Sequence, residues 1–292
     1  MDVKNLGSVG LISSAIGLGT AALTGTYGPV SERECRDVIR LALDMGITMI
    51  DTADLYSGGA IETLLGRVLS RCRHDALIAV HGGMRASVAG KAAVIDGSPA
   101  HLIKACDASL QRLKTDFIDI FYLSRVDPRI PVEDSIGTLA ELAAAGKIRY
   151  IGLGESSAED LRRAHQVYPV SVLAVEYSLW RRPPEGKLLE VAAELGVGIV
   201  ACCPLARGLL AGGSASASSV REQTALRALE AEAAELDLGM ARLALAWLLA
   251  CHDNVVPVPS TRSLAHLEMN VSATKIVLRR DTCARLTRFA AG

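Results

Sequence analysis

The sequence predicts a (β/α)8 TIM barrel. Eight short apolar runs are each followed by an amphipathic, helix-like segment, a pattern typical of parallel strands joined by helices. The chain has 292 residues, 50% of them hydrophobic, which is enough for one large core. The predicted strands are Ala15–Gly19, Ile47–Asp51, Ala76–Val80, Phe117–Leu123, Ile148–Gly152, Ser171–Val175, Gly198–Ala201 and Asn254–Val258.

The helical segments alternate with these strands, and their ends carry stop and start signals. They are Glu32–Met45, Ala60–Arg71, Pro99–Leu113, Glu133–Ala145, Ala158–His165, Glu185–Leu195, Arg221–Ala250 and Ser263–Ala273, with Arg221–Ala250 long enough for two helices. Ser31, Ser98 and Ser157 stand at N-cap positions, and Gly46, Gly146 and Gly196 stand where helices should end. Before the first barrel strand, Val3 to Ser13 predicts a short β-hairpin.

No linker divides the chain, so residues 1–292 are expected to form a single barrel domain. The one low-complexity stretch, residues 212–219, has small and polar side chains and is typical of a surface loop.

A net charge of −1 gives no attraction for nucleic acid or an anionic membrane, and a small molecule is the expected partner. Seven cysteines without CxxC spacing, no signal peptide and no membrane-length apolar run favour a reduced, cytoplasmic setting.

The second predicted strand leads into the most informative motif, Ile50-Asp51-Thr52-Ala53-Asp54-Leu55-Tyr56. This motif resembles the aldo-keto reductase superfamily, in which a strand-end aspartate and a tyrosine begin a catalytic set of Asp, Tyr, Lys and His. The resemblance covers nearly the whole chain. Further matching segments are residues 109–116, 146–152, 176–180, 204–210, 258–262 and 266–270.

The resemblance implies that Tyr56 donates a proton to a substrate carbonyl, while Asp51, paired with a lysine, tunes and orients it. Two other interpretations stay open: Asp51 could cap the following helix, and Tyr56 could simply line a pocket. At the position where the resemblance implies a lysine, this chain has His81. His81 could pair with Asp51, exchange protons near neutral pH, or be structural. At the position where the resemblance implies a histidine, this chain has Ser124, which can supply only a weak hydrogen bond.

The cofactor contacts implied by the resemblance are only partly kept. Where the family holds the nicotinamide ring, this chain has Gly154-Glu155, Ala174 and, in place of a stacking tyrosine, Cys202. The phosphate and adenosine segments are better preserved, so NADP is a possible cofactor, although these motifs could also persist for loop packing. The candidate cofactor-binding residues are Thr20, Leu205, Gly208, Ser260, Thr261, Arg262, His266 and Asn270.

No metal site is expected from the sequence. Cys202 and Cys203 are adjacent at a strand end, where alternation should point them in opposite directions. His101 and His252 match no metal-ligand spacing, and Gly17-Leu18-Gly19 lacks the third glycine of a dinucleotide fingerprint.

These departures favour an enzyme on a reductase scaffold that performs acid–base rather than redox chemistry. Asp51, Tyr56, His81, Ser124 and Glu155 would then catalyse a lyase, dehydratase, isomerase or cyclase step on a small carbonyl-bearing or sugar-like metabolite. One alternative is an NADPH-dependent carbonyl reductase with a divergent site. Another is a non-catalytic protein that senses a dinucleotide.

Overall fold

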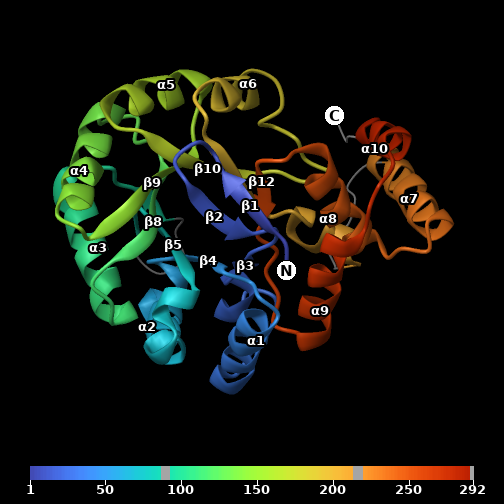
Figure 1. The fold of residues 1–292 in the computed structure, drawn as a ribbon, viewed down its shortest axis with the longest axis horizontal. Helices are drawn as coiled ribbons and strands as arrows, with labels where there is room; N and C mark the ends of the chain where they lie inside the picture. The colour runs from blue at the N-terminus through green and yellow to red at the C-terminus, as the bar shows by residue number, and fades with distance from the viewer. Residues whose placement is uncertain (87–92, 213–219, 290–292) are drawn as a thin grey trace.

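The chain begins with a hairpin that closes one end of the barrel. The computed structural model describes residues 1–86, 93–212 and 220–289, so the predicted loop at 212–219 lies outside the described residues except for Gly212. Strands β1 (Val3–Leu6) and β2 (Leu11–Ser14) pair antiparallel, as predicted (Figure 1). Leu6 and Leu11 are buried against residues of the barrel interior, so the hairpin acts as a plug.

Eight parallel strands then form the barrel, which confirms the predicted fold class. They are β3 (Leu18–Gly19), β4 (Met49–Ala53), β5 (Leu77–Gly82), β8 (Ile118–Arg125), β9 (Ile148–Glu155), β10 (Val170–Glu176), β11 (Gly198–Cys202) and β12 (Val255–Pro257). Each strand pairs with the next along this series. A parallel bridge between Gly19 and Ser260, with the Gly17 amide donating to the Pro257 carbonyl at 2.9 Å, brings the two edges together.

The predicted helices are present, with ends shifted by a few residues. They are α1 (Glu32–Asp44), α2 (Ala60–Val68), α3 (Pro99–Leu113), α4 (Val132–Ala144), α5 (Ala158–Val167), α6 (Lys187–Glu194), α7 (Val220–Glu235), α8 (Met240–Cys251) and α9 (Leu264–Ser272). They surround the strands in Figure 1. Within the described part of the chain, no helix has the length and apolar character of a membrane span.

Several elements were not anticipated from the sequence. A small hairpin, β6 (Met84–Arg85) with β7 (Val94–Ile95), follows β5, and helix α10 (Arg280–Thr287) follows α9. Short 3-10 helices occupy Ala21–Thr24, Tyr56–Gly59, Leu69–Arg71, Arg73–Asp75, Ala206–Ala211 and Ala273–Lys275. The added strands have two residues each and the 3-10 helices three to six, which is too short for a periodicity to be recognised in a sequence.

The predicted helix boundaries follow from capping. The Ser31 and Ser157 side chains accept hydrogen bonds from the Glu34 and Asp160 amides, and both form capping boxes. Ser98 caps α3 by accepting from the His101 amide. Gly46, Gly146 and Gly196 all have positive φ, the left-handed conformation in which helices commonly end.

Strand alternation directs a set of polar side chains to the carboxyl end of the barrel. Met49, Ala79 and Val200 belong to the buried cluster inside the barrel. Residues two positions further along a strand point to the same face. Asp51, His81 and Cys202 therefore point inward at the carboxyl ends of β4, β5 and β11, where such barrels carry their sites.

A buried carboxylate ties β5 and β8 together on the outer face of the barrel. Asp119, which is 1% exposed, accepts from the Arg73 guanidinium at 2.7 Å and from the Ile78 amide at 3.0 Å. It also accepts from Arg149 at 3.1 Å. Both arginines lie over the Phe117 ring, so several cation contacts depend on this one carboxylate.

We expect Asp119→Ala to lower the free energy of unfolding by roughly 3 kcal/mol, because it leaves the mostly buried Arg73 without a counter-ion. Urea denaturation of the purified protein measures the change. Asp116→Ala, an exposed aspartate three residues earlier, is the matched control and should shift stability by less than about 0.5 kcal/mol. Equal effects of the two substitutions would contradict the assignment.

Candidate functional site

A cavity of about 500 Å³ opens at the carboxyl end of the barrel. Its walls come mainly from the loops that follow β3, β4, β11 and β12. Three predicted catalytic residues line it, namely Asp51, Tyr56 and His81. The predicted cofactor-binding residues that line it are Thr20, Leu205, Gly208, Ser260, Thr261, Arg262 and His266. One cavity thus holds most of both predicted sets.

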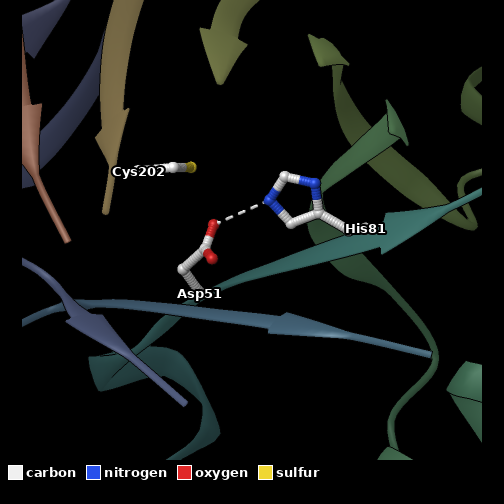
Figure 2. A group of neighbouring side chains, drawn as sticks. All are labelled: Asp51, His81 and Cys202. Atoms are coloured by element: carbon white, nitrogen blue, oxygen red, sulfur yellow. Dashed lines mark hydrogen bonds and ion pairs between the residues drawn. The ribbon is translucent and has the colours of Figure 1, made fainter. Parts of the chain in front are cut away.

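Asp51 and His81 form a pair at the base of this cavity. Their Oδ2 and Nε2 atoms lie 3.1 Å apart, at hydrogen-bonding distance (Figure 2). The two residues come from neighbouring strands in fixed parallel register, in which Ala53 faces His81. Thr20 holds the Asp51 backbone, since its amide and hydroxyl both donate to the Asp51 carbonyl at 2.9 and 3.0 Å. The pair is therefore set by rigid elements.

Tyr122 lies beneath this pair and fixes the imidazole plane. Its ring stacks on His81 with centroids 4.3 Å apart and planes inclined by 16°. Gly152 on β9 makes room for it, because a Cβ there would lie 2.1 Å from the Tyr122 ring. The Tyr122 hydroxyl is buried and has no hydrogen-bond partner among the described residues. Sequence reasoning missed Tyr122, although its position two residues before Ser124 indicates an inward-facing side chain.

Tyr56 is half-buried where the 3-10 helix Tyr56–Gly59 begins. Burial raises the pKa of the Tyr56 phenol well above its usual value, and the charge of Asp51 raises it further. The phenol therefore stays protonated at neutral pH, as an ordinary tyrosine does, and it donates its proton only where a neighbouring group stabilises the phenolate. The following Ser57 has φ of 51°, a strained backbone conformation that turns the chain sharply beside the cavity.

Both adjacent cysteines line the cavity, which corrects the expectation that they would point apart. Alternation holds only within a strand, and β11 ends at Cys202. Cys203 has φ of 48°, so the chain turns there and brings the second side chain back to the cavity. Burial, followed by the nearby charge of Asp51, raises the pKa of the Cys202 thiol well above its usual value.

Ser124, Glu155 and Asn270 do not line the cavity, contrary to expectation. The Ser124 hydroxyl donates to the Gly82 carbonyl at 2.6 Å, a bond that uses its only proton. Glu155 is half-exposed and pairs with Arg125 at 2.6 Å, which neutralises its carboxylate at the rim of the barrel. Asn270 is buried within α9.

The loop after β11 forms one wall of the cavity. Ala206 and Arg207 have positive φ, and Gly208 follows with φ of 98°. Arg207 pairs with Glu176 at 2.9 Å, so the carboxylate at the end of β10 fixes the loop. Strained backbone in a loop fixed by an ion pair is typical of a binding site.

The segment after β12 forms the opposite wall. The Ser260 hydroxyl accepts from the Ala22 amide at 2.6 Å, and the Thr261 hydroxyl accepts from the Ser263 amide at 3.1 Å. Arg262 donates to the Pro29 carbonyl, which leaves further guanidinium donors for a ligand. The α9 N-terminus lies beside it, and with the Arg262 guanidinium it provides a positive environment suited to a phosphate. His266 lines the same part of the cavity.

The residues joined across the barrel include a potential metal-ligand set that the sequence did not predict. Ligand atoms of Asp51, His81 and Cys202 all lie within 4.8 Å of one another. The three residues are separated by 30 and 121 positions, so no sequence spacing could reveal the cluster. The alternation of side chains along a strand could have revealed the cluster, because each of the three residues stands two positions after a residue that points into the barrel.

A second acidic cluster lies behind the β4–α2 connection. Asp54 is largely buried, and its Oδ1 atom has no partner among the described residues. Glu62, which is fully buried, accepts from the Arg112 guanidinium at 2.6 Å. Burial, then the Glu62 charge, raises the pKa of Asp54 to about 7, while Arg112 opposes the shift.

Comparisons with known proteins agree with the fold. A sequence model described as the Aldo/keto reductase family matches residues 15–291. A probable aldo-keto reductase of Glycine max is 36% identical over 94% of this chain and 84% of its own length. A thermostable aldo-keto reductase solved with the inhibitor epalrestat is 30% identical, with a TM-score of 0.83, over 99% of this chain and all of its own.

Two further solved structures cover 99% of this chain. The holo form of an aldo-keto reductase from Bacillus halodurans is 27% identical with a TM-score of 0.87, over 96% of its own length. A glycerol dehydrogenase of Gluconobacter oxydans, at 23% identity, a TM-score of 0.88 and 94% of its own length, supports the fold alone.

These relatives overturn the favoured non-redox function. The sequence argument treated the changes at His81, Ser124 and Cys202 as loss of redox chemistry. Proteins similar over almost the whole chain are nevertheless named as reductases. The expectation of a lyase, dehydratase, isomerase or cyclase is therefore wrong, and substitution of single contacts was too weak an argument against the activity of a whole fold.

We expect the contribution of Asp54 to stability to fall as pH rises from about 4 to about 7, while His165 and His252, whose pKa values are lowered by burial, act in the opposite direction. The folded-state pKa of Asp54, about 7, lies above its ordinary value of 3.8, so in this range Asp54 holds more protons in the folded chain than in the unfolded chain. Asp54→Asn should flatten this decline in thermal melts recorded from pH 5 to pH 8. Asp44→Asn, at an exposed position, should leave the slope unchanged.

Proposed function

Because the chain belongs to the aldo/keto reductase family, we propose that it is an oxidoreductase that reduces a small carbonyl compound with NADPH. The observation that carries the proposal is the single cavity that joins Asp51 and Tyr56 to the cofactor-like walls around Leu205 and Arg262. A proton donor and a dinucleotide-sized site in one cavity are what carbonyl reduction requires.

The far half of the cavity suits the diphosphate and adenosine of a dinucleotide. Arg262 and His266 are exposed there, next to the N-terminus of α9, and Gly208 lets backbone approach a ligand closely. These residues would hold the negatively charged part of the cofactor. The nicotinamide, when bound, supplies the hydride.

The half nearer Asp51 differs from the pattern that the resemblance implies. Cys202 replaces a stacking aromatic ring, and Glu155 is paired with Arg125 at the rim. We infer that the ring is held mainly by shape, between the cysteines and the small side chains Ala21, Ala53 and Val258. Weaker ring anchoring predicts modest cofactor affinity rather than loss of the reaction.

Tyr56 is the proposed general acid. Its phenol lines the cavity in the protonated form, which can donate to a carbonyl oxygen as the carbonyl carbon is reduced. Because burial and the charge of Asp51 raise the pKa of this phenol, the proton transfer needs a neighbouring group that stabilises the phenolate. The Asp51–His81 pair would take the place of an aspartate–lysine pair. The His81 imidazole, which lines the same cavity as Tyr56, would stabilise the phenolate that remains after proton transfer.

We expect Tyr56→Phe to lower kcat for NADPH-dependent aldehyde reduction by roughly 100-fold or more, because it removes the proton donor. The absorbance of NADPH measures the rate. The binding of NADPH should change little, since the aromatic ring remains. Tyr168→Phe, half-buried outside the cavity, is the control and should retain full activity. No turnover in either protein despite tight NADPH binding would favour a dinucleotide sensor instead.

We expect Arg262→Ala to raise the Kd for NADPH about 10-fold, the scale of one charge-assisted hydrogen bond to a phosphate. The Kd for NADH should change less, because NADH lacks the extra phosphate. Quenching of protein fluorescence on titration gives both values. Arg40→Ala, at an exposed position on α1, is the control. An unchanged NADPH Kd would remove Arg262 from the proposed site.

A further inference from the structure

Three side chains of different donor chemistry meet at one end of the barrel. Figure 2 shows Asp51, His81 and Cys202 turned toward a common space, and their ligand atoms lie within 4.8 Å of one another. They offer a carboxylate oxygen, an imidazole nitrogen and a sulfur. This combination is typical of zinc sites, which take three protein ligands and leave a fourth position open when they are catalytic.

We propose that Asp51, His81 and Cys202 bind one Zn²⁺ ion at the base of the cavity, with the fourth coordination position open to the cavity. The site shares Cys202 with the proposed nicotinamide pocket, but it shares no residue with the diphosphate and adenosine half of the cavity. Metal binding does not depend on the proposed function. Only its catalytic consequence, a positive charge beside Tyr56 where a lysine is otherwise expected, rests on that function.

The geometry needs little adjustment. Tetrahedral Zn²⁺ places nitrogen, oxygen and sulfur ligand atoms about 3.3 to 3.6 Å apart. Asp51 Oδ2 and His81 Nε2 are already 3.1 Å apart. The remaining contraction, from 4.8 Å at most, is within the reach of side-chain rotation at Cys202. Each ligand stands on a separate strand, so the backbone already holds the arrangement.

The surroundings favour a cation at this point. Asp51 is 7% exposed and lies beside the partly buried thiol of Cys202, and a bound cation would compensate both as a carboxylate and a thiolate. Tyr122 supplies an independent observation. It is fully buried below the cluster, stacks on His81, and has a hydroxyl with no partner among the described residues. The stacked Tyr122 ring holds the His81 imidazole in a fixed plane, as the supports of metal-binding histidines do.

The protons balance simply. Zn²⁺ binds the Cys202 thiolate, the Asp51 carboxylate and the neutral His81 imidazole. The thiol proton passes to solvent, together with any second proton carried by the imidazole. No electron is transferred, and no oxidant is needed. Binding therefore releases acid and strengthens as pH rises.

Zinc content and cobalt absorption test the site directly. Protein stripped with EDTA, reloaded with ZnSO4 and gel-filtered should retain about one Zn²⁺ per chain by mass spectrometry of the metal. Loading with CoCl2 should give a thiolate-to-cobalt charge-transfer band and the visible bands of a tetrahedral ion. Cys202→Ser should abolish the charge-transfer band and weaken zinc binding at least roughly 100-fold.

Cys203→Ser is the matched control, because Cys203 lines the same cavity but lies outside the three-residue cluster. This variant should keep its zinc content after loading and the absorption spectrum of its cobalt form. Alkylation tests the unaltered protein, whatever the variants do: Zn²⁺ should protect Cys202, and not Cys203, from iodoacetamide, as peptide mass spectrometry would show.

Three results would overturn the site: less than roughly a tenth of an equivalent of zinc after loading, a cobalt spectrum unchanged in Cys202→Ser, or no protection of Cys202 from alkylation. Each of these can occur while NADPH-dependent carbonyl reduction persists. Failure of the metal site and failure of the proposed function are therefore distinguishable.

Discussion

The alternation of side chains along closed parallel strands is the constraint on which the site depends. Inside the barrel, Met49, Ala79 and Val200 pack against one another and exclude water. Because the strands are in fixed register, the next inward positions must also converge, one layer higher. Asp51 and Cys202 meet there although they are distant in sequence. Core packing therefore positions the chemistry.

The same constraint explains how His81 can replace the lysine implied by the resemblance while the inward arrangement of the site residues is kept. His81 occupies an inward position whatever its side chain, and Tyr122 beneath it holds the imidazole by stacking. Gly152 provides the space for Tyr122. These three residues form a matched set, in which the ring on β5 is supported by a ring on β8 and by a glycine on β9.

The cavity combines two electrostatic environments. Asp51, Tyr56 and Cys202 form an acidic centre in which Asp51 is buried and the other two side chains are partly buried. Burial raises the pKa values of the phenol and the thiol. Arg262 gives the far wall a positive character suited to phosphate, and His266 lies on the same wall. A ligand with an anionic end and a neutral, polarisable end fits this division, as does a cation at the acidic centre.

The sequence by itself determined the eight strands, the capped helices and the inward residues Asp51 and His81, because apolar periodicity and capping are local properties. It also indicated the cofactor-like segments around Leu205 and Arg262. Only the tertiary structure decided which candidates share a cavity. Ser124 and Glu155 were excluded by partners from β5 and β8, namely the Gly82 carbonyl and Arg125. Cys202 was brought beside Asp51 across the barrel, because barrel closure joins residues that have no fixed separation along the chain.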